Sequence, residues 1–128
     1  MFASLFLFAL QSTGDAKLAN KPIPPEARDA IRSVRAAAKA KDFRSLQRWM
    51  VPVFSWSFGG DDDAEQAINA WKRNPEAMRH LYRVTGLRCV FWGDMQTIQC
   101  PPSAGYNYRA GFVLADHGWR MAYFVAGD

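Results

Sequence analysis

Apolar residues recur every three or four positions in the first part of this chain, which is the spacing of helices with one buried face. This pattern predicts a first helix that begins at Pro24-Pro25, where a proline in the first turn costs no hydrogen bond, and ends near Lys41. A second, short helix is predicted over residues 43–50. Asp42 precedes it and is the expected capping residue.

Helical spacing returns after Gly59-Gly60 and predicts two more helices. Asp62 and Glu65 have the spacing of a capping box at the start of the first of them. Asn74-Pro75 begins the second, with asparagine as the cap and proline at its first position, and Gly86 ends it. The acidic run 61–63 is therefore interpreted as a turn followed by capping carboxylates.

The apolar spacing changes from helical to alternating in two regions, and alternation predicts strands. Residues 53–58 alternate large apolar and small polar side chains between the helices. The last third predicts two hairpins with four-residue loops, and their strands cover residues 87–92, 97–100, 106–114 and 119–126. This order predicts an α+β fold in which N-terminal helices pack on a curved antiparallel sheet that ends in a meander of two hairpins.

The N-terminus has the pattern of an export signal. Residues 2–10 are apolar or small and carry no charge, and small residues follow at Ser12, Thr13, Gly14 and Ala16, as a signal-peptidase site requires. We therefore expect a signal peptide over residues 1–14, a leader over 15–24 and one domain over 25–128. The run is too short to span a bilayer, so the mature protein is expected in the periplasm or outside the cell, without a membrane span.

Composition limits the classes of function that remain. The 128 residues are enough for one domain, and a net charge of +4 is too small to indicate nucleic-acid binding. The densest charge feature is a stripe on the first helix formed by Arg28, Arg32, Arg35 and Lys39 and continued by Lys41, Arg44 and Arg48. Such a stripe is typical of a solvated helix face, and it is also a candidate surface for an acidic partner.

The two cysteines are expected to form a disulfide. If residues 93–96 form the loop of the first hairpin, Cys89 lies opposite Cys100 on the paired strand. An exported domain would keep this bond, whereas two free thiols would be the form in a reducing compartment.

Few residues suggest site chemistry. His80 on the last helix and the aromatic residues Trp56 and Tyr108 are candidates for binding a ligand, although such aromatics also fill cores. The sequence has no nucleophile elbow, phosphate-binding glycine loop or ligand spacing for a metal, so we expect no catalytic residue, no metal and no cofactor.

Several segments together resemble a group of small exported, periplasmic proteins of proteobacteria to which no activity is assigned. These segments are 54–61, 67–71, 89–102, 108–112, 118–121 and 124–128. The resemblance implies an exported domain over most of residues 25–128. The order of elements also resembles the cone-shaped fold of SnoaL-like and ketosteroid isomerase-like domains, which includes both enzymes and binding modules.

The sequence thus predicts an exported, non-catalytic domain that binds a periplasmic protein or a small ligand. One alternative is a small cone-fold enzyme of the isomerase or dehydratase type, with His80 or Tyr108 as the first residue to test. The other is an inhibitor or immunity-type protein that acts through Arg28, Arg32 and Arg35.

Overall fold

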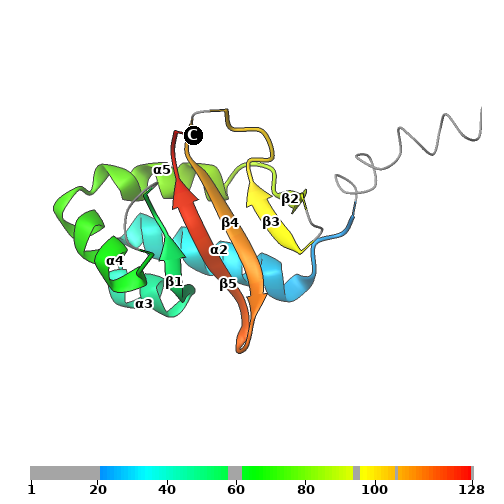
Figure 1. Ribbon diagram of the computed structural model, residues 1–128, viewed down its shortest axis with the longest axis horizontal. Coiled ribbons are helices and arrows are strands. Elements are labelled where there is room, and N and C mark those ends of the chain that lie inside the picture. The colour runs from blue at the N-terminus through cyan, green and yellow to red at the C-terminus, as the bar shows by residue number, and fades with distance from the viewer. Residues whose placement is uncertain (1–20, 58–61, 94–95, 106, 128) are drawn as a thin grey trace, which may run out of the picture.

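The computed structural model describes residues 21–57, 62–93, 96–105 and 107–127. The elements in these residues are α2 (Pro25–Ala40), α3 (Phe43–Arg48), β1 (Met50–Ser55), α4 (Ala64–Arg73), α5 (Glu76–Thr85), β2 (Val90–Trp92), β3 (Thr97–Cys100), β4 (Arg109–Ala115) and β5 (Gly118–Val125). Helix α2 crosses behind β4 and β5, and α5 lies above it in the view of Figure 1. The predicted α+β class is confirmed.

The ends of α2 and α3 follow the local signals closely. Pro25 is the first residue of α2, and Lys41 ends that helix in the left-handed conformation with a φ of 54°. At α3, the hydroxyl and the backbone N–H of Ser45 both donate to the Asp42 carboxylate, and these bonds lower the pKa of Asp42. The expected capping box before α4 is wrong by one residue, because Asp63 rather than Asp62 accepts from the next turn. At α5 the expected Asn74 cap is wrong, because Pro75 is the capping residue and no side chain caps that helix.

The sheet is mixed rather than wholly antiparallel. Its strand order is β1-β5-β4-β3-β2, and β1 runs parallel to β5, while the remaining pairs are antiparallel. Hairpin-type connections force neighbouring strands to be antiparallel, whereas β1 is separated from β5 by two helices and three strands, so its direction is set by packing.

Strand β1 also begins earlier than the expected 53–58. It includes Pro52, which precedes the expected strand. Proline is tolerated there because β1 is an edge strand, where one side of the backbone has no partner strand.

The two C-terminal hairpins form, with one change in loop length. Trp92 pairs with Thr97, so the expected first loop over residues 93–96 is confirmed, although 94–95 lie outside the described residues. In the second hairpin Ala115 pairs with Gly118, which leaves a two-residue loop instead of four. Gly118 has a φ of 111°, which favours glycine at this tight turn. Strands β2 and β4 begin three residues later than expected, at Val90 and Arg109.

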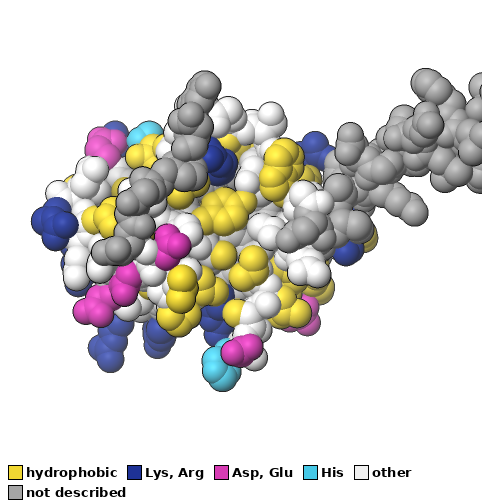
Figure 2. All heavy atoms as spheres, in the orientation of Figure 1, with side chains coloured by type: hydrophobic (Ala, Val, Ile, Leu, Met, Phe, Trp, Pro, Cys, Tyr) yellow, Lys and Arg dark blue, Asp and Glu magenta, His cyan; other side chains and the backbone are white. Residues whose placement is uncertain are grey.

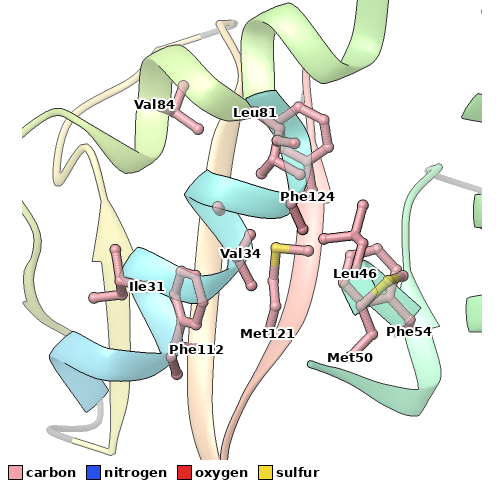
Figure 3. Close-up of a cluster of buried hydrophobic side chains, with 14 of the residues drawn as sticks. Ile31, Val34, Leu46, Met50, Phe54, Leu81, Val84, Phe112, Met121 and Phe124 are labelled. Atoms are coloured by element: carbon pink, nitrogen blue, oxygen red, sulfur yellow. The ribbon is translucent and has the colours of Figure 1, made fainter. Parts of the chain in front are cut away.

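The space between α2, α5 and the sheet is filled by apolar side chains. Those that Figure 3 labels are Ile31, Val34, Leu46, Met50, Phe54, Leu81, Val84, Phe112, Met121 and Phe124. Each is at most 7% exposed, so they form one continuous core.

The opposite face of the sheet has no helix over it among the described residues, and hydrophobic side chains gather over its middle (Figure 2). Gln99, Gly111 and Tyr123 lie side by side across three strands on this face. A Cβ at Gly111 would lie 2.0 Å from the Tyr123 ring, so only glycine allows this ring to lie flat across β4. The Tyr123 hydroxyl donates to the Gln99 side-chain oxygen, and the Gln99 amide donates to the Pro101 carbonyl at 3.0 Å.

Candidate functional site

A groove lies between the beginning of α2 and the end of α5. It has a volume of about 410 Å³. We call it the basic groove, and its lining includes the aliphatic residues Ile23, Ile31 and Leu87 and the arginines Arg28, Arg32 and Arg88. Three arginine and three aliphatic side chains therefore line the same groove.

Helical periodicity explains why two of these arginines share the groove. Arg28 and Arg32 are four residues apart, one turn of α2, so both project on the same exposed side of the helix. Ile31 is 7% exposed and faces inward beside them. Leu87 is 42% exposed, which is high for leucine and leaves its side chain available in the groove.

Arg32 has an ion pair, but a weak one. Its Nη2 lies 2.6 Å from the Asp29 carboxylate, and both side chains are largely exposed. Exposed pairs of this kind contribute at most about 1 kcal/mol, because water screens them and ordering the side chains costs entropy. An acidic ligand can therefore compete for Arg32 at small cost.

Arg35, the third arginine of the predicted stripe, holds the two helices together instead. Its guanidinium carbon lies 3.9 Å from the centre of the Tyr82 ring on α5, and its Nε is buried without a hydrogen-bond partner. A Cβ at Gly86 would lie 2.9 Å from that Nε, so a larger residue there would displace the end of the Arg35 side chain. Cation–π packing against Tyr82 makes Arg35 a structural contact between α2 and α5.

The candidates His80 and Tyr108 lie together. Their rings are stacked with centroids 4.3 Å apart, and Tyr108 also stacks on Phe124 at 4.9 Å. Trp71 and Phe54 continue this row by edge-to-face contacts. The row joins α5 to the sheet, and both candidate residues are half-buried in it.

Trp56, the remaining aromatic candidate, follows β1 and is half-buried against the same core. It is not among the residues that line the basic groove.

The predicted disulfide between Cys89 and Cys100 is confirmed. Their sulfur atoms are 2.03 Å apart and their Cα atoms 4.3 Å apart, which matches residues facing each other at a non-hydrogen-bonded position of an antiparallel pair. Cys89 also lines the basic groove, so the bond anchors one wall of this groove to the sheet.

The groove offers positive charge and an apolar surface. No group of three or more His, Cys, Asp or Glu side chains that could hold a metal ion occurs in the part of the chain that the structure describes. None of the helices in the described ranges has both the length and the apolar character needed to cross a bilayer.

Sequence reasoning missed Ile23, Leu87 and Arg88 as site residues. Ile23 comes from the leader just before α2. Leu87 and Arg88 come from the segment after α5, and the packing of α5 against α2 brings them beside Arg28. The one signal in the sequence was a leucine and an arginine directly after the predicted helix end at Gly86.

No family model matches the chain, and no curated protein matches it. The fold is similar to a crystal structure of an NTF2-like protein with a cystatin-like fold from Novosphingobium aromaticivorans, with a TM-score of 0.44 and 16% sequence identity over 78% of this chain and 77% of that one.

Proposed function

We propose that this chain is an exported binding domain whose basic groove holds an acidic segment of a periplasmic protein partner. The observation that carries the proposal is that Arg28, Arg32 and Arg88 line the same groove as Ile23 and Leu87. Guanidinium groups bind carboxylates in paired hydrogen bonds, and the aliphatic residues would contact an aliphatic side chain between two acidic ones.

The size of the groove favours a short segment. A volume of about 410 Å³ accommodates a few side chains rather than a large flat interface. The net charge of +4 would draw an acidic partner toward this surface before contact. Binding to an acidic partner through this face is also how an inhibitor or immunity-type protein would act.

Export has two independent supports. Residues 2–10 have the apolar pattern of a signal peptide, and the Cys89–Cys100 disulfide is the form that persists in an oxidising compartment. A periplasmic partner is consistent with both.

Charge reversal tests the binding proposal. The probe is a fluorescent peptide that alternates glutamate and leucine, with its glutamine counterpart as the neutral reference, and binding is measured by fluorescence anisotropy. The double variant R28E/R32E is expected to lower the affinity for the acidic peptide about tenfold or more, because two attractive charges become repulsive.

The matched control is K72E/R73E, which makes the same change in net charge at the exposed end of α4. We expect it to change the affinity less than about twofold, because these two residues do not line the groove and salt screens the charges of exposed side chains. An equal loss in both variants, or equal binding of the glutamine peptide, would show that the groove is not the site.

Export is tested by the mass of the processed chain. Expressed in a bacterium with its secretion system intact, the protein is expected in the periplasmic fraction, beginning at Asp15 or Lys17. Leu7→Arg should retain the full-length chain in the cytoplasm by interrupting the apolar run. Recovery of full-length wild-type chain with reduced thiols would refute export.

A further inference from the structure

A second hollow lies beside the β4–β5 hairpin, and residues of that hairpin contribute to its lining. The hairpin itself is at the bottom of Figure 1. The hollow has a volume of about 550 Å³ and we call it the aromatic pocket; its lining includes Lys21, Pro24, Phe91, Val113, Leu114 and Trp119. The segment 21–24 contributes to both sites, since Ile23 lines the basic groove while Lys21 lines the aromatic pocket.

Two aromatic side chains from strands that are not neighbours form the walls of the pocket. Phe91 is on β2 and Trp119 is on β5, with β3 and β4 between them. At a spacing of about 4.8 Å per strand, the backbones of β2 and β5 are about 14 Å apart in a flat sheet. The ring centroids of Phe91 and Trp119 are nevertheless 6.4 Å apart, with an interplanar angle of 70°. The two side chains therefore lean toward each other, and their rings form a corner.

Leucine and lysine complete the pocket. Leu114 pairs with Trp119 across β4 and β5 and is 67% exposed, so it offers an aliphatic surface beside the indole. The ammonium group of Lys21 lies 4.3 Å from the centre of the Phe91 ring. Among the described residues that line the pocket, Lys21 is the only charged one, and none carries a carboxylate.

We infer that the aromatic pocket is a small-molecule site for a flat, apolar organic monoanion, such as an aromatic carboxylate or sulfonate. The volume lies within the range of about 300–1,000 Å³ that is usual for small-molecule sites. Phe91, Trp119 and Leu114 would contact the ring system, because aromatic corners bind flat apolar groups. Lys21 would exchange its contact with the Phe91 ring for a charge-assisted bond to the anion.

This inference does not depend on the proposed function. Arg28, Arg32 and Arg88 do not line the aromatic pocket, and the acidic peptide and the organic anion are different ligands. The two sites can therefore be tested, and can fail, separately.

The probe is 1-anilinonaphthalene-8-sulfonate, a flat aromatic monoanion whose fluorescence rises in apolar sites, titrated into the purified chain with its disulfide formed. Saturable binding of one dye per chain is expected. Leu114→Glu should weaken binding about tenfold or more, because it places a negative charge in the pocket. Val53→Glu is the matched control at an aliphatic residue that is 71% exposed on β1, and it should change the affinity less than about twofold.

Lys21→Gln tests the charge. It should weaken the sulfonate dye about threefold or more while leaving the neutral analogue N-phenyl-1-naphthylamine within about twofold, because only the anion interacts with the ammonium group. Circular dichroism checks that each variant is folded. Non-saturable binding, equal losses for Leu114→Glu and Val53→Glu, or equal losses for both dyes in Lys21→Gln would each overturn the inference.

Discussion

Replacing Phe124 by alanine is expected to lower the free energy of unfolding by about 3–5 kcal/mol, the usual cost of removing a buried phenylalanine. Phe124 is 2% exposed. Its ring stacks on Tyr108 at 4.9 Å and meets the edge of Trp71 at 5.8 Å. Alanine would remove both contacts and leave a cavity between α4, α5 and the sheet, because the surrounding elements can collapse only partly.

Urea unfolding followed by circular dichroism measures this loss. The control is Val53→Ala, an exposed position on β1 where we expect a change within about 0.5 kcal/mol. The Phe124 variant should also disturb the stacked pair of His80 and Tyr108, which would appear as a shift in the His80 ring resonances in NMR spectra. A Phe124 variant as stable as the control would show that this aromatic row is not part of the core.

Loss of the disulfide is expected to lower the free energy of unfolding by about 3 kcal/mol, because the unfolded chain is then no longer constrained by the loop between Cys89 and Cys100. Cys100 is fully buried, so alanine is the suitable replacement at both positions. The hairpin that the bond closes also carries Phe91, and Cys89 lines the basic groove. Binding of both probes should therefore weaken when the bond is removed.

Denaturation with and without a reducing agent provides the measurement. The wild-type midpoint should fall on reduction, whereas that of C89A/C100A should be the same in both conditions. A wild-type midpoint that reduction leaves unchanged would show that the bond does not stabilise the fold. Mass spectrometry, which detects the two hydrogen atoms added on reduction, confirms the state of the bond in each sample.

Elements whose signals are local could be predicted well from the sequence. The pairing of Trp92 with Thr97 and the facing cysteines followed from counting residues through one short loop, because register in a hairpin is set by the turn. Asp42 capped α3 as expected, since the acceptor and the donor on Ser45 are three residues apart. Errors at Asp63 and in the second hairpin loop were of one or two residues, where neighbouring residues compete for the same role.

The candidate site could be predicted only in part. Arg28 and Arg32 share the basic groove because helical periodicity places them on one side of α2. Arg35 continues the same stripe in the sequence, yet it is held against Tyr82 because α5 packs beside this turn of the helix. The periodicity of one helix does not show which other element of the fold will pack against each of its turns.

By itself, the sequence determined the α+β class, the helices and hairpins, the opposition of Cys89 and Cys100 and the basic stripe on α2. These features depend on residues close together in the chain. Only the tertiary structure decided that β1 lies parallel to β5, that Arg35 is a packing residue and that Phe91 meets Trp119 in a pocket. Those outcomes depend on which elements pack together, and this arises from the summed burial of apolar surface over the whole domain.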